Sequence, residues 1–411
     1  MMVENSDFAL KKQSRIGKHA VQPVIQCSRC IMDSNDDPDI KFDAHGVCQY
    51  CLEFDKEKKV LVKEGKEAEE LMAKTIAEIK EYGKNKKYDC LIGLSGGVDS
   101  SYVAYIAKQK GLRALCVHFD NGWNSELAVM NIQNIVTKLG FDLYTYVIDW
   151  EEFKDLQLAY LKASVIDIEV ITDHAIYGTI YKIAKENDLK YILGGHNVVT
   201  EGILPHHWAF NIKDYINIKD IHSKYGTKKL NTFPFLNRKM KRYITNSGVR
   251  FVNFLNWLPY VKTAAKKTLQ QELDWRDYGS KHHESIWTKF YQVYILPIKF
   301  GVDKRKAHLS TLICSGQITK EEALKEISKP AYDDLQIRTD KEFVLKKLGL
   351  TENEFDKIMK EPVRSHWSFN FEGSIFHYYP ILKPFRPLWE SIKSLRGLWN
   401  ASWIVSFTMS F

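Results

Sequence analysis

The sequence predicts an α/β protein whose parallel sheet carries helices on both faces, preceded by a small four-cysteine zinc ribbon and followed by a helix-rich C-terminal region. Three observations predict this order. Two Cys-x2-Cys pairs lie near the N-terminus, short β-rich runs alternate with helical patterns over residues 88–200, and this alternation is lost after residue 205. Alternating strands and helices favour a parallel sheet. At 411 residues with 45% hydrophobic residues, the chain is long enough for two or three domains.

Shifts in composition divide the chain into six segments. Residues 56–87 are rich in Lys, Glu and Ala with recurrent apolar positions, which predicts one amphipathic linker helix. The segments are a lead-in at 1–25, the zinc ribbon at 26–55, the linker helix at 56–87, the α/β domain at 88–205, a helical region at 206–330 that completes the site, and a helical, aromatic-basic tail at 331–411.

Charge and cysteine content limit the classes of partner and compartment. The net charge of +8 suits an anionic partner or substrate, and by itself fits nucleic acid, a nucleotide sugar or a membrane surface equally well. Seven cysteines, an odd number with four in two pairs, favour a reducing compartment and metal binding over disulfides. We find no apolar signal core at the N-terminus and no run long enough for a membrane span, so we expect a cytoplasmic protein.

The first element is the zinc ribbon. Cys27-x2-Cys30 and Cys48-x2-Cys51 are separated by 17 residues, a spacing typical of a four-thiolate zinc site. Because four protein ligands leave no open coordination position, we interpret the zinc as structural. An iron–sulfur cluster is the alternative occupant.

One helix of the C-terminal region and the elements of the α/β domain can be placed from sequence patterns. Thr319, with Glu322 three residues later, forms a capping-box pattern that predicts a helix over 317–328. Within the domain, we expect strands at 88–94, 113–119, 142–148 and 190–194, and helices at 101–110, 125–139, 151–163 and 173–187.

The segment SGGVDSS at residues 95–101 joins the first strand to the first helix of this domain. Glycines let the backbone approach a ligand closely, and serine hydroxyls and the free N–H groups of a helix start favour an anion. No Gly-Lys-Ser/Thr follows, so this is not a Walker A loop. We expect a phosphate group here, with Mg²⁺ held by Asp99. The residues predicted to contact the nucleotide in this loop are Ser95, Gly96, Gly97, Asp99, Ser100 and Ser101.

Polar residues end two further strands. In such sheets, ligands lie beyond the carboxyl ends of the strands. We therefore expect these residues to reach the nucleotide or substrate, although Asp-Asn-Gly is also a common turn, a loop histidine is commonly solvated, and Asp173 near the start of a helix suits an N-cap. The candidates are His118, Asp120 and Asn121 after the second strand, and Gly195, His196 and Asn197 after the fourth.

Basic residues and a His-His-Glu cluster supply candidates for catalysis. Cations near a pyrophosphate loop can neutralise charge on the leaving group, and His283, with His282 and Glu284 as alternatives, is a candidate general base for an incoming amine. A solvated charged helix face is the simpler interpretation of the same residues. The predicted catalytic set is Asp99, Lys299, Lys304, Arg305 and His283.

The SGGVDSS loop resembles that of the PP-loop ATP pyrophosphatases, and a longer series of motifs resembles the N-acetyl sugar amidotransferases of the WbpG/PseA type. The series covers roughly residues 26–330. It runs CSRCIMD, IKFDAHGVCQYC, SGGVDSSY, HFDNGWNSELAV, GGHNVVTEG and WRDYGSKHHESIWTKFYQVYILPIKFGVDKRKAHLSTLICSGQITKEEAL.

This resemblance implies a reaction. The acetamido group of a nucleotide-linked sugar would be activated by ATP, with release of pyrophosphate, as an O-adenylyl imidate, and ammonia would then displace AMP to leave an acetamidino group. The setting implied is the biosynthesis of lipopolysaccharide O-antigen or another surface polysaccharide. The cofactors implied are ATP, Mg²⁺ and a structural Zn²⁺.

The source of ammonia is a separate question. Cys90 and Cys116 fall in predicted buried strands, Cys314 lacks a nucleophile elbow, and position 2 is Met, so we predict no glutaminase activity in this chain. The resemblance implies separate glutaminase and cyclase-like subunits that supply ammonia.

Two other functions compete with this one. A tRNA-modifying PP-loop enzyme, such as a thiolase, also combines zinc ribbons with this loop, but it usually needs further cysteines, and we consider nucleic acid an improbable partner. A zinc-ribbon adaptor without activity would not need the intact loop. The tail, with Trp367, Trp389, Trp399 and Trp403 among basic residues, suits packing or a partner, and at most a peripheral membrane contact.

Overall fold

A five-stranded parallel sheet forms the centre of the molecule in the computed structural model, which describes residues 23–279 and 284–372. All strand pairs are parallel and the strand order is β3-β2-β1-β4-β5, so the predicted class of sheet is confirmed. The strands are β1 (Cys90–Gly93), β2 (Ala114–Asp120), β3 (Asp142–Val147), β4 (Tyr191–Leu193) and β5 (Arg250–Val252).

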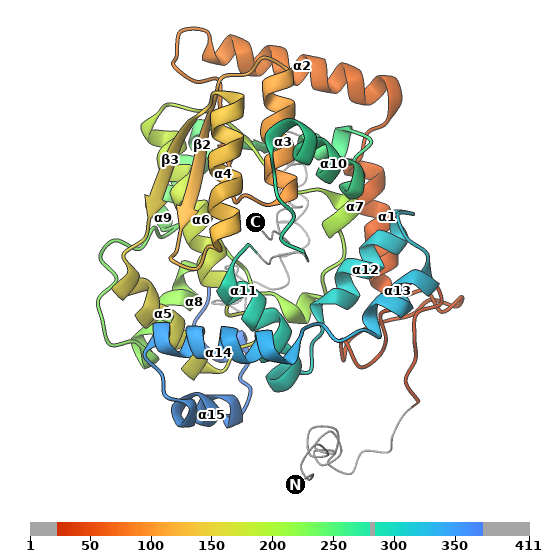
Figure 1. Cartoon of the computed structure of the whole chain (residues 1–411), viewed down its shortest axis with the longest axis vertical. Coiled ribbons are helices and arrows are strands. Elements are labelled where there is room, and N and C mark those ends of the chain that lie inside the picture. The colour runs from red at the N-terminus through yellow and green to blue at the C-terminus, as the bar shows by residue number, and fades with distance from the viewer. Residues whose placement is uncertain (1–22, 280–283, 373–411) are drawn as a thin grey trace, which may run out of the picture.

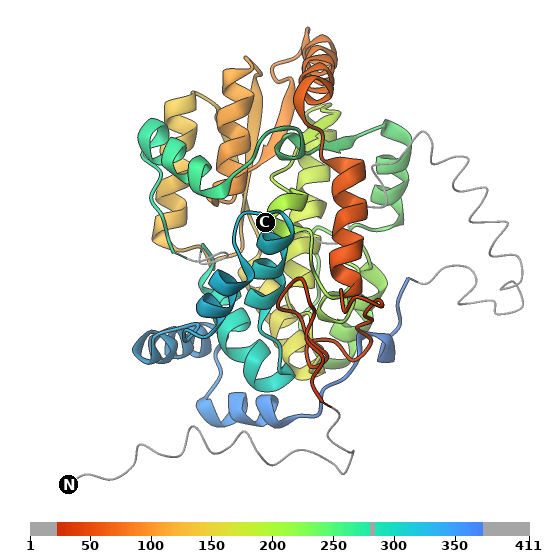
Figure 2. The same cartoon turned by 90° about the vertical axis from the view of Figure 1, so that its right-hand side faces the viewer.

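Helices cover both faces of the sheet, as Figures 1 and 2 show. The helices α3 (Val98–Gln109) and α4 (Glu126–Leu139) lie on one face, and α6 (Val170–Glu186) lies on the other. Helix α5 (Trp150–Ala163) lies beyond the carboxyl end of the sheet, where it packs against α8 (Tyr215–Tyr225). Side chains alternate along a strand, so Cys90 and Ile92 of β1 join the core under α3 and α4, whereas Leu91 joins the core that includes α6. The strands that follow β1 in the chain first extend the sheet on one side, as β2 and β3, and then on the other, as β4 and β5. In such sheets the ligand-binding crevice lies where the direction changes, here at the carboxyl ends of β1 and β4.

The fifth strand lies outside the segment 88–205 in which we predicted strands. β5 is only three residues long, and Tyr191, Ile192 and Leu193 of β4 pair with its residues. A run this short has no measurable periodicity, so sequence patterns could not separate it from a loop.

The predicted linker helix at 56–87 is two helices, α1 (Gln49–Leu61) and α2 (Gly65–Gly83). The chain leaves α1 in an extended conformation at Val62, and the backbone N–H of Lys63 donates to the carbonyl of Asn256 at 2.9 Å. Gly65 then adopts a φ of +57°, which favours glycine at the turn into α2. A contact with a distant part of the chain therefore breaks a pattern that looked continuous.

The region after β4 is helical, as predicted, and the Thr319–Glu322 capping box is present at the start of α13. Residues Tyr291–Phe300 continue α11 as a π-helix. The helices are α7 (Val198–Glu201), α8 (Tyr215–Tyr225), α9 (Arg238–Ser247), α10 (Lys262–Leu273), α11 (Ile286–Phe290), α12 (Lys304–Cys314), α13 (Lys320–Ile327), α14 (Asp334–Leu348) and α15 (Glu352–Lys360).

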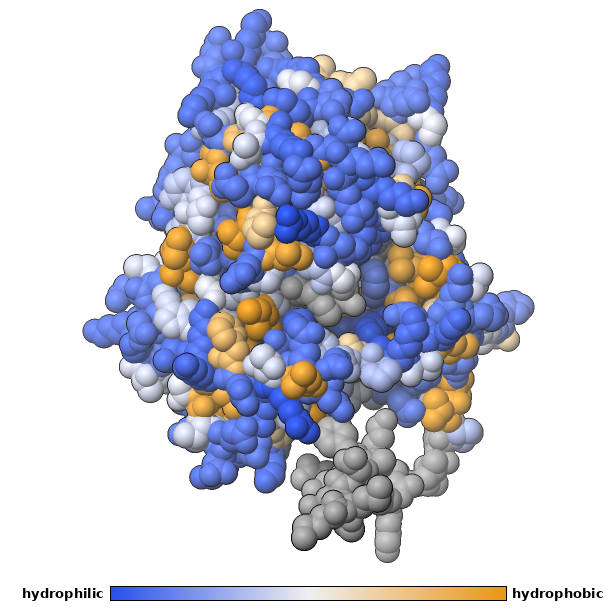
Figure 3. Space-filling model, in the orientation of Figure 1, coloured by the Kyte–Doolittle hydropathy of each residue, from blue (hydrophilic) through white to orange (hydrophobic). Residues whose placement is uncertain are grey.

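Among the described residues, no helix is both long enough and apolar enough to cross a bilayer. The face in Figure 3 is largely hydrophilic, with its hydrophobic residues in small separate groups. Trp367 is 65% exposed, whereas Trp389, Trp399 and Trp403 lie outside the described residues, so the predicted role of the tail stays a prediction.

Candidate active site

The SGGVDSS loop connects β1 to α3 at the carboxyl end of the sheet. Ser95 Oγ lies 3.1 Å from Ser100 Oγ and accepts from the Gly97 N–H at 3.2 Å, and the Ser101 hydroxyl donates to the Gly97 carbonyl at 2.5 Å. The N-cap residue of α3 is Gly97, which has no side chain to cap the helix, and the Tyr278 hydroxyl lies beside this helix start. The loop is therefore held by its own serines, and the helix start keeps N–H groups for an anion.

Two glycines make close approaches that a larger residue would prevent. Gly96 adopts a φ of +82°, and a Cβ there would lie 2.6 Å from the carbonyl oxygen of Ala128. A Cβ on Gly195, at the end of β4, would lie 3.0 Å from the Ser100 backbone nitrogen. The glycine motifs after β1 and β4 thus meet at the start of α3, as the sheet topology requires.

Three aromatic residues that sequence analysis did not select surround this loop. The Trp275 indole N–H donates to the Gly96 carbonyl at 2.9 Å, and the Tyr260 hydroxyl donates to Asp99 Oδ1. The Tyr278 hydroxyl lies beside Gly97, where a Cβ would be 3.2 Å away. Trp275 and Tyr278 belong to the WRDYG segment. Sequence analysis considered the charged residues of that segment, whereas its aromatic residues are the ones that contact the loop.

The residues after β2 divide between the cavity and the turn. His118 and Asn121 line a cavity of about 90 Å³ beside Ser95. His118 Nδ1 lies 3.1 Å from the Leu94 carbonyl and Nε2 lies 3.1 Å from Asn124 Nδ2, which assigns a neutral imidazole that donates from Nδ1. Burial lowers the pKa of His118, in agreement with that state. Asp120 instead accepts from the Gly122 N–H at 2.8 Å and shapes the turn.

His196 and Asn197, which follow β4, make contacts with nearby residues of α7. Asn197 Oδ1 accepts from the Thr200 N–H and hydroxyl, both at 2.9 Å, and so caps α7. His196 Nδ1 lies 3.0 Å from Glu201 Oε2, and both side chains are buried. Neither His196 nor Asn197 lines the cavity beside Ser95. Their predicted contact with the nucleotide therefore has no support in this arrangement, whereas Gly195 does lie at the loop.

Acidic residues at the start of α6 form the opposite wall of the same cavity. Glu169, Thr172 and Asp173 line it, and Glu169 Oε2 accepts from the Thr288 hydroxyl at 2.7 Å. Burial raises the pKa of Glu169 to about 7, and burial together with Glu169 and Asp167 raises the pKa of Asp173 well above its ordinary value. The sequence pointed to Asp173 as a helix cap, and gave no signal for Glu169 or Thr172.

The predicted basic residues separate into three places. Lys304 lines the cavity beside Ser95 and also a second cavity of about 330 Å³, which lies between α7, α10 and α12. Arg305 lines only the second cavity, and its guanidinium binds Asp303. Lys299 lines neither cavity, and its ammonium donates to the carbonyls of Ile358 and Glu361 at the end of α15. Its predicted catalytic role therefore has no support in this arrangement and stays a prediction. His283 lies outside the described residues.

The four predicted metal ligands form one buried cluster. The Sγ atoms of Cys27 and Cys51 are 3.9 Å apart, those of Cys30 and Cys48 are 3.7 Å apart, and those of Cys48 and Cys51 are 3.7 Å apart. A tetrahedron of sulfurs at about 2.3 Å from zinc has edges of about 3.8 Å, so the cluster fits zinc. Cys314, which looked isolated in the sequence, lies against this cluster with its Sγ 3.5 Å from Cys51 Sγ.

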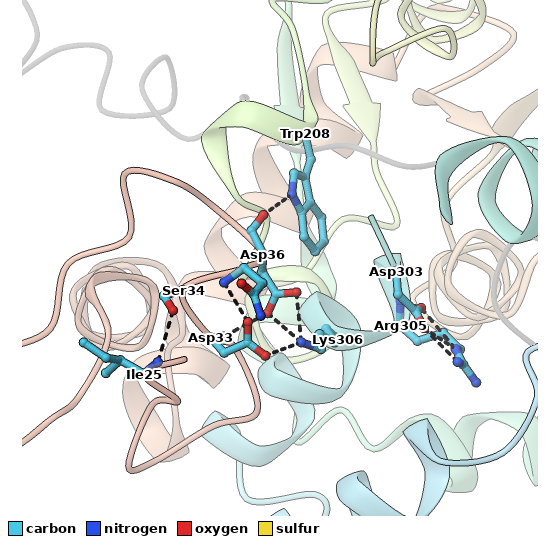
Figure 4. Close-up of polar contacts among 9 residues, drawn as sticks. Ile25, Asp33, Ser34, Asp36, Trp208, Asp303, Arg305 and Lys306 are labelled. Carbon is cyan, nitrogen blue, oxygen red and sulfur yellow. Dashed lines mark hydrogen bonds and ion pairs between the residues drawn. The ribbon is translucent and has the colours of Figure 1, made fainter. Parts of the chain in front are cut away.

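The ribbon holds α12 through a buried ion-pair network. Lys306 Nζ donates to Asp33 Oδ2 at 2.6 Å and to Asp36 Oδ1 at 2.9 Å, and the Trp208 indole donates to the Asp36 carbonyl at 2.8 Å. Figure 4 shows these contacts next to the Asp303–Arg305 pair at the start of the same helix. The ribbon thereby fixes the helix that carries Lys304.

Comparisons with known proteins agree with this division of the chain. Residues 88–197 match the family model "Asparagine synthase", and residues 284–383 match "LPS biosynthesis protein WbpG-like, C-terminal domain". The chain combines a PP-loop ATP pyrophosphatase domain with a WbpG-like C-terminal domain. The predicted relationship is therefore confirmed.

Individual relatives are more distant. An uncharacterised protein of Methanocaldococcus jannaschii is 25% identical over 76% of this chain and 99% of its own length. A tRNA-specific 2-thiouridylase of Clostridioides difficile is 28% identical to this chain in the aligned part. That part covers 27% of this chain and 35% of the other protein. Among solved structures, an NH3-dependent NAD synthetase from Campylobacter jejuni matches with a TM-score of 0.31 and 16% identity, over 69% of this chain and 97% of the other.

Proposed function

We propose that this protein is an ATP-dependent amidotransferase, a carbon–nitrogen ligase that converts the acetamido group of a nucleotide-linked sugar into an acetamidino group during lipopolysaccharide or other surface-polysaccharide biosynthesis. One observation carries the proposal. The WbpG-like region supplies Thr288, Gln292 and Lys304 to the same small cavity that the SGGVDSS loop lines with Ser95. The segment typical of the sugar pathway therefore completes the wall of the ATP-using site.

The first step needs a group that accepts pyrophosphate. Residues 95–101 present serine hydroxyls and helix N-terminal N–H groups, and Gly96, Gly97 and Gly195 leave room that a Cβ would fill. ATP is the substrate of this step, and the amide oxygen of the sugar attacks its α-phosphorus. Asp99 fits Mg²⁺, which when bound would neutralise charge on the phosphates. Lys304 places a cation at the same cavity, as the charge of the leaving group requires.

The second step exchanges oxygen for nitrogen. Ammonia attacks the activated carbon, and AMP departs with the former amide oxygen. All seven cysteines lie in the described residues, and none lines either cavity. Burial raises the pKa of Cys90 and Cys116, which leaves both thiols protonated. These facts support our proposal that ammonia comes from a separate glutaminase. We further propose, from the family resemblance alone, that a cyclase-like subunit takes part and that the complex works in the cytoplasm.

A reconstitution assay tests the reaction. The protein is incubated with ATP, an ammonium salt and a panel of UDP- and CMP-linked acetamido sugars, and the products are analysed by mass spectrometry. We expect AMP and pyrophosphate together with a sugar in which NH replaces one oxygen. Ser95→Ala and Asp99→Ala should abolish both products, whereas the surface variant Glu69→Gln on α2 should not.

Three results would contradict the proposal. Release of ADP in place of AMP would exclude the adenylyl intermediate. Turnover with glutamine as efficient as with ammonium would exclude the separate glutaminase. Modification of tRNA, with no acetamido sugar accepted, would favour the tRNA-modifying alternative.

A further inference from the structure

The acidic wall of the small cavity contains polar atoms that the protein does not satisfy. Glu169 is only 9% exposed, and its Oε1 makes no hydrogen bond of normal geometry among the described residues, although the Trp287 side chain lies near enough to lower the pKa of the carboxyl. The Thr172 hydroxyl, on the same turn of α6, is also buried without a partner there. Both residues line the cavity that Ser95 lines from the other side. Burying such groups unpaired costs free energy, so a ligand that donates hydrogen bonds would stabilise the site.

The charge in this corner of the cavity is unbalanced. The carboxyl groups of Glu169 and Asp173 line the cavity, and that of buried Asp167 acts on both, whereas Lys304 is the only lysine or arginine that lines the cavity among the described residues. Asp167 is partly satisfied, since its Oδ2 accepts from the Phe210 N–H at 2.8 Å. Whenever Glu169 or Asp173 is ionised, its carboxylate favours a small cation over an anion, and a bound cation would in turn lower the raised pKa values of both groups.

We propose that Glu169, Asp173 and Thr172 form the binding site for the nitrogen nucleophile, held as ammonium, and that this corner of the cavity is distinct from the phosphate-binding loop. The inference rests on the proposed amidotransferase function, which requires a nitrogen donor at this cavity. Ammonium fits because it donates several hydrogen bonds to carboxylate and hydroxyl oxygens. The neighbouring walls of Ile176 and Ile180 are apolar, and Mg²⁺, which usually keeps several waters, suits them less well.

The site also gives the proton a destination. A proton passes from ammonium to a carboxylate oxygen of Glu169 or Asp173, which leaves ammonia with a free electron pair. That pair forms the new bond to the imidate carbon, and the bond from this carbon to the AMP oxygen breaks, with its electrons leaving on AMP. The product nitrogen keeps the remaining protons as an amidinium group. Burial raises the pKa of Glu169 to about 7 and raises that of Asp173 well above its ordinary value, and a carboxylate with a raised pKa accepts a proton more readily than an ordinary one.

Thallium(I), which has a charge and size similar to those of ammonium, provides a test that does not depend on turnover. Crystals of the full chain are soaked in a thallium(I) salt and examined by anomalous diffraction. We expect a peak within coordination distance of Glu169 and Thr172, and its loss in the Glu169→Gln, Asp173→Asn double variant. An empty cavity in the wild-type crystal would overturn the proposal, and so would a manganese(II) peak at the same position, which would make it a divalent-metal site.

Kinetics supply the second test once a sugar substrate is known. Each of Glu169→Gln and Asp173→Asn should raise the KM for ammonium by about tenfold or more, the effect expected for a lost charge-assisted hydrogen bond. The KM values for ATP and sugar should stay unchanged. Hydroxylamine, which is largely neutral at pH 8, should be used almost as well by the variants as by the wild type.

The outcomes separate this inference from the proposed function. A raised KM for the sugar would assign the carboxylates to the sugar, and equal losses with hydroxylamine and ammonium would indicate a structural role, so either would overturn the ammonium site. If no acetamido sugar is a substrate, the proposed function fails, and the thallium experiment still decides whether the cation site exists.

Discussion

Replacement of Glu169 by Gln should make the protein more stable at alkaline pH. Glu169 is buried beside Asp167, and these conditions raise its pKa from the ordinary 4.5 to about 7. A carboxyl with a raised pKa in the folded state binds its proton more tightly there than in the unfolded chain. It therefore costs nothing below about pH 4.5, and it destabilises the fold increasingly as the pH rises through 7.

The size of this effect follows from the two pKa values. Each tenfold change in proton affinity corresponds to about 1.4 kcal/mol, so the difference between 4.5 and about 7 corresponds to about 3 kcal/mol at pH 8 and above. Gln keeps the shape of the side chain and can still accept from the Thr288 hydroxyl. It removes the negative charge and places an NH2 donor where one carboxylate oxygen stood.

Urea unfolding of the wild type and the Glu169→Gln variant at a series of pH values from 4.5 to 8.5 measures the effect. The free energy of unfolding of the variant should exceed that of the wild type by about 3 kcal/mol at the alkaline end and by almost nothing at the acidic end. Glu69→Gln, on the exposed surface of α2, is the matched control and should show no such trend. A difference that does not change with pH, or a variant less stable than the wild type at pH 8, would refute the reasoning.

Three further predictions concern the loop, the ribbon and its metal. Gly96→Ala should abolish ATP-dependent activity and lower the unfolding midpoint, because its Cβ would lie 2.6 Å from the Ala128 carbonyl oxygen. The control Gly316→Ala, with a similar φ of +76° and open space around it, should lower the free energy of unfolding by only about 1 kcal/mol. Equal effects of the two substitutions would contradict this prediction. Lys306→Met should lower the free energy of unfolding by about 2 kcal/mol, since it strands Asp33 and Asp36, while Lys329→Met, which breaks an exposed pair, should change it by less than about 0.5 kcal/mol. Elemental analysis should find zinc in the wild type and in Cys314→Ala but not in Cys48→Ala, and loss of the metal from Cys314→Ala would make that thiol a ligand.

Predictions from local sequence patterns agree with the structure where the residues of a single segment determine the element. The apolar run before the SGGVDSS loop became β1, and the cysteine spacing was sufficient to predict the buried four-sulfur cluster. β5 and the break between α1 and α2 depend on partners far along the chain, namely β4 and the Asn256 carbonyl. Local periodicity contains no information about such partners.

The candidate site shows the same division. Lys299 stands near Lys304 in the sequence, but the π-helical segment and its glycine end at Gly301 turn Lys299 towards α15 and away from the cavity. Glu169 and Thr172 resemble ordinary residues at a helix start, and only the arrival of Thr288 from α11 on the opposite side shows that they enclose a cavity. Spacing was enough to predict the loop that we propose binds the phosphates, whereas only the tertiary structure brings together the residues that we propose bind the second reactant.

The four-cysteine ribbon can influence the proposed reaction through the helix that it holds, without contacting a substrate. Three consecutive residues at the start of α12 contact three different neighbours. Lys304 lines the small cavity, Arg305 forms an ion pair with Asp303, and Lys306 forms an ion pair with Asp33 of the ribbon. Because consecutive residues of a helix are rigidly spaced, fixing Lys306 against Asp33 and Asp36 also fixes the direction in which Lys304 leaves the helix. The Lys320 ammonium adds a second attachment through the Cys27 carbonyl at 2.6 Å. Zinc removal should therefore lower the rate of the proposed ATP-dependent step, because it loosens the ribbon that holds Lys306 and with it the helix that carries Lys304.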